Sequence, residues 1–478
     1  MSDIRHEKER LSARQRMALL FDDGSFEEFA AGDAAGVVTG RGTVSGRSVY
    51  AYSQDSSVAG GAMSEIMAAR ICEVMDLALS ERAPLVALND SVGAKIQDGV
   101  ASLAGYGDIF KRNIKASGVI PQISGVFGPC AGGSVYSPAL TDFTVMAQDS
   151  SYMFVTGPSV VKAVTGENVS KEGLGGASLH AGKSGVAHHS ACSESDAIGW
   201  IRNLLCFLPS NNMASAPAVS CSDPVERQCG SLSVPDNPAK AYDMLSVVRS
   251  ISDDGCFFEI HEAWAKNIIV GFARMGGQSV GVVANQPKMM AGVLDINASR
   301  KAARFVRFCD AFNIPIVTLV DVPGFLCGVQ QESAGIISHG AKLLYAYGEA
   351  TVPKITVTLR KSFGGAHITM ACKQLGGDVN FAWPSANIAV MGADGAIEIL
   401  YAKELASEAD PAARQELSRR LREEYQDKYC SLLSAADQGY IDEIIRPEDT
   451  RFKVISALRN VSDRKAEAPW KKHDNLPL

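Results

Sequence analysis

The chain has 478 residues, of which 46% are hydrophobic and 21% are charged, and its formal net charge is -7. This length leaves room for two domains with full hydrophobic cores, and the composition is typical of a soluble α/β protein. The negative charge and the lack of a basic run with interleaved aromatic residues argue against nucleic-acid binding. No apolar stretch is long enough to span a bilayer, so we expect no membrane insertion, and the polar N-terminal residues do not resemble a signal peptide.

The eleven cysteines are scattered, with no CxxC pair and no spacing typical of metal ligands. We therefore predict buried thiols in a reducing compartment, a cytoplasmic location and no metal site. His188 and His189 form a histidine pair without a second cluster of ligands, so we expect them to have a structural or surface role.

The first half begins with residues 1–22, which are charged and amphipathic and predict a docking helix. Hydrophobic patterns then predict strands in 25–29 and 37–54, a helix opening at 60–63 and ending at 79, a strand in 84–90, a helix in 93–113 and a strand in 119–126. A small-residue turn, a strand and a further helix are expected in 128–133, 151–155 and from 157 onward. The glycine-rich stretch 173–185 predicts a loop.

The second half follows residues 209–236, whose richness in Pro, Ser and Asn predicts a linker. We accordingly place one domain in residues 1–225 and another in residues 237–478. The elements expected in the second domain are strands in 278–285, 315–321 and 352–359, a helix in 300–312 and a charged, solvated helix in 406–424.

The expected elements of the two halves come in the same order. In each half a strand ends in an acidic residue, Asp90 or Asp321, and a later strand ends in a glycine pair, Gly132-Gly133 or Gly364-Gly365. We infer that one unit has been used twice. Strands alternating with helices in both halves predict two α/β domains with helices covering the faces of their sheets.

Each glycine pair is a candidate oxyanion hole. A strand that ends in such a turn and opens into a helix leaves backbone N–H groups without an intrahelical partner. Those donors favour an anion or a polarised carbonyl, and glycine lets a ligand approach the backbone closely. A tight turn with glycines for packing would have the same sequence. Two related domains with one hole each could hold two different carbonyl-bearing reactants.

Longer motifs add a resemblance to a known family. In the first half they are residues 90–97 (DSVGAKIQ), 117–124 (SGVIPQIS), 128–133 (GPCAGG) and 136–142 (YSPALTD). In the second half they are residues 284–288 (ANQPK), 294–297 (LDIN), 304–310 (RFVRFCD), 321–325 (DVPGF), 339–342 (HGAK) and 389–392 (AVMG). In this order they resemble the carboxyltransferase (β) subunits of biotin-dependent acyl-CoA carboxylases. The similarity covers nearly the whole chain, and it is greatest to propionyl-CoA carboxylase β and methylmalonyl-CoA decarboxylase α subunits.

The resemblance implies two tandem crotonase-like domains related by internal duplication, in a homohexamer built as a trimer of dimers. It implies that the N-terminal domain binds acyl-CoA. There Gly132 and Gly133 would polarise the thioester carbonyl, and Ala131 and Gly93 would contact the substrate.

The same resemblance assigns biotin binding to the C-terminal domain. Gly365 and Ala366 would hold the ureido oxygen of biotin on the partner subunit, and Phe325 would contact substrate. Ile368 would lie near the end of the acyl tail, where an apolar side chain tolerates tails of varied length.

The implied reaction moves a carboxyl group from carboxybiotin to the α carbon of a short acyl-CoA, propionyl-CoA or acetyl-CoA, through an enolate held in oxyanion holes. The freed ureido nitrogen can serve as the base, which agrees with the lack of a well-placed His or Glu pair near either turn. The chain has no Ala-Met-Lys-Met biotin attachment site and no GxxxxGK nucleotide loop. We therefore expect separate biotin carboxylase and biotin carboxyl carrier subunits, with acyl-CoA as substrate and no metal.

Two residues keep alternative roles. Asp321 could be a general acid, or a strand-end carboxylate that caps the following turn. Lys342 could contact a CoA phosphate, or it could be an ordinary surface lysine.

Several positions near the expected site depart from the family pattern. Val92 stands where glycine is usual, which would be strained if the turn needs a positive φ. The others are Lys95 for an arginine, Cys327 for a proline, Val329 for a polar residue, Ser338 for an arginine, and Phe363 and His367 for tyrosines. The chain is also shorter than family members between Phe29 and Val37.

Four functions remain open. The first is carboxylation of an acyl-CoA, and the second is the same half-reaction run backwards in a decarboxylase complex. The third is action on another thioester, such as one bound to a carrier protein, which the departures motivate. The last is a non-catalytic scaffold. Direction depends on partner subunits, which this chain does not contain.

Overall fold

The computed structural model describes residues 10–31, 35–230, 234–430, 432–461 and 469–477. It divides into two compact units. Unit 1 comprises Met1–Pro217, Ile260–Trp264 and Ala311–Asn313, and unit 2 comprises Ala218–Glu259, Ala265–Asp310 and Ile314–Leu478. The predicted N-terminal helix appears as α1 (Ala13–Leu20), and residues 1–9 of that prediction lie outside the described residues.

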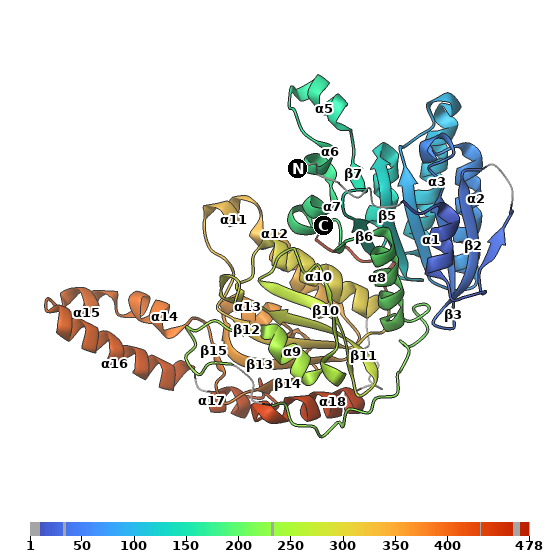
Figure 1. Ribbon diagram of the computed structural model, residues 1–478. Helices are drawn as coiled ribbons and strands as arrows, with labels where there is room; N and C mark the ends of the chain where they lie inside the picture. Colours follow the sequence, from blue (N-terminus) through green and yellow to red (C-terminus); the bar gives the residue numbers. More distant parts are fainter. Residues whose placement is uncertain (1–9, 32–34, 231–233, 431, 462–468, 478) are drawn as a thin grey trace, which may run out of the picture. The chain divides into compact units, whose positions relative to one another are not determined.

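Unit 1 contains an eight-stranded sheet with the order β1-β2-β3-β4-β5-β6-β8, in which β7 pairs with β5. The strands are β1 (Glu27–Phe29), β2 (Val37–Val44), β3 (Arg47–Gln54), β4 (Leu85–Ser91), β5 (Gln122–Ala131), β6 (Phe143–Ala147), β7 (Tyr152–Phe154) and β8 (His189–Ala191). β1, β2 and β3 pair antiparallel, and the pairings from β3 to β8 are parallel. Figure 1 shows this sheet and its helices in blue to green.

Helices cover both faces of the unit 1 sheet. α1, α2 (Glu65–Ser80), α4 (Tyr136–Leu140) and α8 (Glu194–Phe207) contact its strands, and α3 (Val100–Ala116) packs on α2. The other helices of the unit are α5 (Pro158–Thr165), which has no buried residue, α6 (Lys171–Gly175) and α7 (Ala177–Leu179). α2 and α3 form one core with β3 and β4, through Met67, Ile71, Tyr106 and Leu85. Every residue of β4 is buried, as expected for a parallel strand covered on both faces.

Unit 2 repeats the same sheet, with the order β9-β10-β11-β12-β13-β14-β16 and with β15 paired to β13. Its strands are β9 (Phe257–Ile260), β10 (Ile268–Met275), β11 (Gln278–Asn285), β12 (Ile316–Val322), β13 (Lys354–Phe363), β14 (Val379–Ala382), β15 (Asn387–Ala389) and β16 (Glu443–Ile444). Its helices include α9 (Met244–Ile251), α10 (Ile296–Ala311), α11 (Val329–Ser333), α12 (Ile336–Glu349), α13 (Gly364–Thr369), α17 (Leu432–Asp437) and α18 (Thr450–Val461).

The duplication extends to irregular details. The register between the central strands shifts between Asn89 and Ser91 in unit 1, and between Val320 and Val322 in unit 2. An isolated parallel bridge follows each shift, Met63 with Ala94 and Leu294 with Phe325. The prediction of two α/β domains related by internal duplication is therefore confirmed.

Two predicted boundaries differ from the structure for one reason. β5 and β13 continue to Ala131 and Phe363, beyond the predicted ends at 126 and 359, because β7 and β15 pair with the extensions.

The glycine-rich stretch 173–185, for which the sequence predicts a loop, is largely helical. It contains α6, α7 and one π-helical turn, His180–Ser184. Ser170 caps α6 by accepting a hydrogen bond from the Gly173 N–H.

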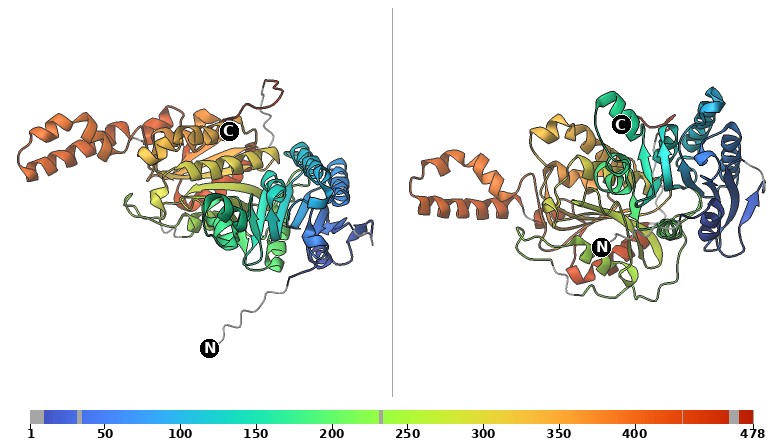
Figure 2. Two further views of the ribbon diagram at one scale, coloured as in Figure 1. Left: turned by 90° about the horizontal axis from the view of Figure 1, so that it is seen from above. Right: turned by 45° about the horizontal axis from the view of Figure 1, so that its top comes forward.

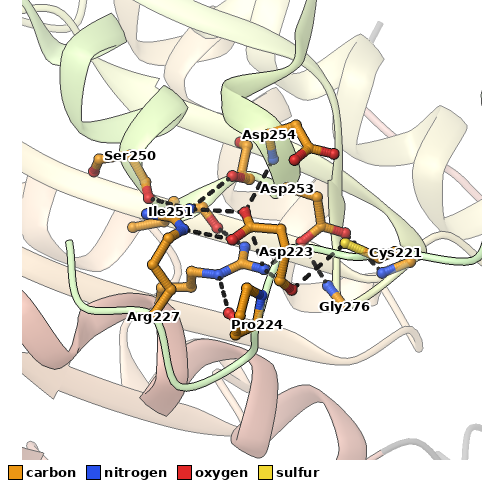
Figure 3. A network of polar contacts seen from close by, with 12 residues as sticks. Cys221, Asp223, Pro224, Arg227, Ser250, Ile251, Asp253, Asp254 and Gly276 are labelled. Atoms are coloured by element: carbon orange, nitrogen blue, oxygen red, sulfur yellow. Dashed lines mark hydrogen bonds and ion pairs between the residues drawn. The ribbon is translucent and has the colours of Figure 1, made fainter.

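The part of the predicted linker around Asp223 is held onto unit 2 by buried charges (Figure 3). Arg451 of α18 has no exposed side-chain surface and pairs with Asp253 at 2.6 Å and with Asp223 at 3.4 Å. Asp223 also accepts hydrogen bonds from Arg227 Nε at 2.6 Å and from the Asp254 N–H at 3.0 Å. Asp253 accepts from the Gly276 and Gly277 N–H groups in the β10–β11 turn, at 2.9 and 2.7 Å. The stretch around Asp223 is thus part of a packed unit.

A helical hairpin projects from the rest of unit 2 (Figures 1 and 2). It consists of α14 (Ala393–Leu400), α15 (Ala402–Ser407) and α16 (Pro411–Tyr429). Only Leu421 and Tyr425 of α16 are buried, which agrees with the charged, solvated helix predicted in 406–424. No helix among the described residues combines the length and apolar composition needed to cross a membrane.

Candidate active site

The first glycine turn lies where β5 ends and a short helical turn, Gly132–Val135, leads into α4. Gly132 has φ +60°, a conformation that side chains other than glycine adopt at a cost. Gly133 is glycine for another reason: a Cβ there would lie 2.9 Å from the Tyr106 ring. The turn therefore presents backbone at both positions, at the start of a helical segment whose first N–H groups lack intrahelical acceptors.

The turn after β4 packs against the end of β5. Gly93 has φ +114°, and a Cβ on it would lie 3.0 Å from the Ala131 carbonyl oxygen. The structure thus brings together Gly93, Ala131, Gly132 and Gly133, the four residues expected in unit 1. Val92 does not adopt a positive φ, so the strain considered for it does not arise. Its side chain is 52% exposed.

The second glycine turn lies where β13 ends and α13 begins. After the register shift, Cys130 pairs with Ser91 in unit 1 and Ser362 pairs with Val322 in unit 2, so Cys130 and Ser362 hold equivalent positions in the two sheets. Gly132 is therefore equivalent to Gly364, whose φ is +59°. The repeated glycine pairs are thus in step, whereas Gly365 and Ala366, the residues expected to hold biotin, align with Gly133 and Ser134. Gly365 is exposed, while the Ala366 side chain is fully buried.

Phe325 and Ile368 both lie at the second turn. The Phe325 ring lies 3.9 Å from the position that a Cβ on Gly365 would occupy, and 3.1 Å from that of Gly340. Ile368 is on α13 and is 47% exposed. The four residues expected in unit 2 are thus close neighbours, and Gly365 offers open backbone beside one aromatic ring.

His367, which also lies on α13, contacts the end of β13 through its Nδ1 atom, 2.9 Å from Ser362 Oγ. Burial lowers the pKa of His367, so its imidazole is neutral at pH 7. Thr369 donates a hydrogen bond to the Gly365 carbonyl at 2.8 Å. Two side chains of α13, His367 and Thr369, therefore hydrogen-bond to residues of the second turn and of the strand end before it.

The two strand-end aspartates are buried partners of arginines. Asp321 accepts a hydrogen bond from Arg360 Nε at 2.8 Å and from the Lys361 N–H at 3.2 Å, and it has no exposed surface. Asp90 accepts from Arg16 at 3.0 Å and from Ser56 at 2.9 Å. Asp321 makes no bond to the turn that follows it, and its pairing with Arg360 supports a structural role over a general-acid role.

The histidine pair has structural contacts within unit 1. The His188 ring stacks on His261 with centroids 4.1 Å apart, and its Nδ1 accepts the Thr144 N–H at 3.0 Å. His189 lies 2.8 Å from a Glu262 carboxylate oxygen and stacks on Trp200.

The cysteines differ in part from the prediction that they are buried. Six of them are buried, but Cys192, Cys256 and Cys327 are exposed. Within the described ranges, no group of three or more His, Cys, Asp or Glu side chains is arranged to hold a metal ion.

Sequence reasoning missed the side chains that support the first turn. Tyr106, Ser134 and Ser91 come from α3, from the turn itself and from the end of β4. The Tyr106 hydroxyl lies 2.5 Å from Ser134 Oγ, which donates to Ser91 Oγ at 3.3 Å. No local signal marks Tyr106, because it fits the apolar face of α3 and its partners are distant in sequence.

Comparisons with known proteins concern the family and the fold of the chain. Residues 5–476 match a family model described as the carboxyl transferase domain. The chain is 55% identical over 495 residues to the propionyl-CoA carboxylase beta chain of Cereibacter sphaeroides, covering 100% of this chain and 95% of the relative. It is 52% identical to the mitochondrial propionyl-CoA carboxylase beta chain of Sus scrofa, covering 100% and 90%. A solved structure of transcarboxylase 12S, described as showing hexamer assembly and substrate binding to a multienzyme core, superposes with a TM-score of 0.94 at 48% identity, covering 98% and 93%.

Proposed function

The chain belongs to the carboxyl transferase family, and from that membership we propose that it moves a carboxyl group from carboxybiotin to the α carbon of propionyl-CoA or acetyl-CoA. The observation that carries this proposal is the 55% identity to a propionyl-CoA carboxylase beta chain over the whole length. Action as an acyl-CoA carboxyltransferase follows from that similarity, and the finer assignments rest on the two glycine turns.

We propose that unit 1 holds the acyl-CoA. Gly132 and Gly133 would donate their N–H groups to the thioester oxygen, while Gly93 and Ala131 contact the substrate. Removing the α proton creates an enolate, and each preformed donor at the developing oxyanion contributes typically ~3–4 kcal/mol. The exposed Val92 side chain would border the thioester, where it narrows the space beside the acyl group.

We propose that unit 2 holds biotin from the partner subunit, at Gly365 and Ala366. The open backbone at Gly365 fits this group, because a Cβ there would make only ordinary contact, at 3.9 Å, with Phe325. When bound, carboxybiotin supplies the carboxyl group and afterwards a ureido nitrogen that can accept a proton. The residues of this chain would bind and orient the two reactants. Phe325 lines the turn, and the exposed Ile368 would contact the acyl tail.

The biotin would be attached to a separate carrier subunit, and a biotin carboxylase would supply the carboxyl group. We further propose a homohexamer built as a trimer of dimers and a cytoplasmic location. The hexamer assembly described for the transcarboxylase 12S structure supports the first of these. The same half-reaction in a decarboxylase complex is an alternative, since partner subunits decide the direction of transfer.

The test uses the full chain with carboxylated biotin carrier protein, labelled in the carboxyl group, and either propionyl-CoA or acetyl-CoA. We expect label to appear in methylmalonyl-CoA or malonyl-CoA without added ATP. A carrier-protein thioester in place of the CoA thioester tests for action on another class of thioester. Failure to carboxylate any CoA thioester would contradict the proposal.

A further inference from the structure

A chain of buried hydroxyl groups lies behind the first glycine turn. Tyr106 of α3 is 4% exposed, Ser134 is 6% exposed and Ser91 is fully buried. The phenol hydroxyl lies 2.5 Å from Ser134 Oγ, and Ser134 donates to Ser91 Oγ at 3.3 Å. The Gly93 N–H donates to the same Ser91 oxygen at 3.2 Å. One hydrogen-bonded chain thus connects the turn after β5 with the turn after β4.

Tyr106 also controls the shape of the turn through its ring. A Cβ on Gly133 would lie 2.9 Å from Cδ2 and 3.1 Å from Cε2 of that ring, so the ring supports the backbone of Gly133 directly. Burial raises the pKa of Tyr106, so its hydroxyl stays protonated at neutral pH and remains a donor. The ring and the hydroxyl of one residue therefore hold two successive residues, Gly133 and Ser134.

Unit 2 shows that the fold does not require this chain. At the positions that align with Ser91 and Ser134 it has Val322 and Ala366, which carry no hydroxyl. Its second turn is held instead by the contact between Ser362 and His367. Since the same sheet and the same turn form without the hydroxyl chain, the chain is explained better by a task of the first turn than by folding.

We propose that Tyr106 is a positioning residue for carboxyl transfer, which fixes the N–H groups of Gly132 and Gly133 relative to Gly93. The inference rests on the proposed function of that turn. Amides aimed at a developing oxyanion act in the transition state, so a small displacement lowers kcat more than it changes ground-state binding. Tyr106 need not touch the substrate for this effect.

The test compares Tyr106→Phe with Tyr347→Phe in the full chain, using carboxylated biotin carrier and propionyl-CoA. Tyr347 is a matched control, because it is also buried, at 0% exposed against 4% for Tyr106, and its hydroxyl lies 2.9 Å from Oγ1 of Thr318 in the middle of β12. We expect Tyr106→Phe to lower kcat about tenfold or more while KM for propionyl-CoA changes less than about threefold. Tyr347→Phe should keep kcat within about twofold of the wild type, since it loses a similar bond at a distant place.

A second variant separates positioning of the Gly132 and Gly133 N–H groups from a general loss of stability around the first turn. Ser134→Ala removes the next member of the chain, so the double variant Tyr106→Phe/Ser134→Ala should be no slower than the more impaired single variant. Equal kcat in Tyr106→Phe and wild type, or equal losses in Tyr106→Phe and Tyr347→Phe, would overturn the inference while leaving the proposed function intact. A wild-type chain that carboxylates no CoA thioester would overturn both.

Discussion

Gly133 and Gly365 occupy the same place in the two units, yet their surroundings differ. A Cβ at Gly133 would lie 2.9 Å from the Tyr106 ring, whereas one at Gly365 would be 3.9 Å from Phe325. Neither residue has a positive φ, so backbone strain does not decide between them. Only the first position therefore requires glycine for packing.

An alanine exchange at each position should show this difference. We expect Gly133→Ala to lower the free energy of unfolding by about 1–3 kcal/mol, because a buried ring must move to admit the methyl group. Gly365→Ala should leave that free energy within about 0.5 kcal/mol of the wild type. Urea denaturation followed by far-UV circular dichroism measures both. Equal stability of the two variants would show that the Tyr106 ring yields freely.

At the scale of elements, much of the architecture could be predicted from the sequence. The buried apolar runs that form β4, β5, β12 and β13, the helices between them and the repetition of the pattern can all be predicted from local sequence patterns. The extension of β5 to Ala131 could not be predicted in this way, because it depends on pairing with β7. The correspondence of Gly132-Gly133 with Gly364-Gly365, by contrast, is visible in the sequence repeat, and the strand register agrees with it.

The boundary between the units, after Pro217, falls inside the predicted linker, but the part around Asp223 is packed onto unit 2 in a way that the sequence does not show. The Pro, Ser and Asn content of this segment is typical of an exposed loop. Asp223, however, pairs with Arg451, which lies 228 positions further along the chain, and composition does not reveal such an interaction. The candidate site shows the same division: glycine turns are visible in the sequence, whereas Tyr106 and the Arg360 partner of Asp321 are known only from contacts.

The charges that hold this segment predict a pH dependence. The side-chain hydrogen bond from Arg227 is the main cause that lowers the pKa of Asp223. Burial opposes the shift at Asp253, but the N–H groups of Gly277 and Gly276 and the Arg451 guanidinium still hold its pKa below the usual value. The unfolded chain therefore takes up these protons at a higher pH than the folded chain.

It follows that both carboxylates stabilise the fold above about pH 4, the unfolded pKa, and that this stability is lost as the pH falls through the folded pKa values. Between about pH 5 and pH 3, the range around the usual pKa of a carboxyl group, we expect the free energy of unfolding of the wild type to fall. The fall should be smaller in Asp253→Asn, because an asparagine side chain does not bind a proton in this range. Urea denaturation at several pH values gives both slopes. Parallel slopes would contradict the assignment.

At the scale of the whole molecule, the division into units does not follow chain order. Ile260–Trp264, from the second half of the sequence, belongs to unit 1. There the His261 N–H donates to the His188 carbonyl at 2.9 Å, and the Trp264 ring packs so closely on Gly185 that a Cβ would lie 2.5 Å from it. A break after Pro217 would therefore remove part of the core of unit 1.

Replacing Trp264 tests that statement in the full chain. Trp264 is 5% exposed, so Trp264→Ala should lower the free energy of unfolding by about 3–5 kcal/mol. Trp470 is 90% exposed, and Trp470→Ala should change it by less than about 0.5 kcal/mol. Urea denaturation, with tryptophan fluorescence and circular dichroism recorded together, compares the two. Equal effects would mean that the 260–264 segment adds nothing to the stability of unit 1.

The buried aspartates have a consequence for how the two copies can evolve. Asp321 receives its counter-charge from Arg360 on the neighbouring strand, while Asp90 receives it from Arg16 on α1 and from Arg10. The position in unit 1 that aligns with Arg360 is Gly128, where a Cβ would lie 1.9 Å from an Asp90 carboxylate oxygen. If the sequence of β13 replaced that of β5, the Arg360 side chain would come to lie where Asp90 already fills the space. If β5 replaced β13, Asp321 would lose Arg360 and remain buried without that partner. The two units share one fold, but their equivalent strands can no longer be exchanged.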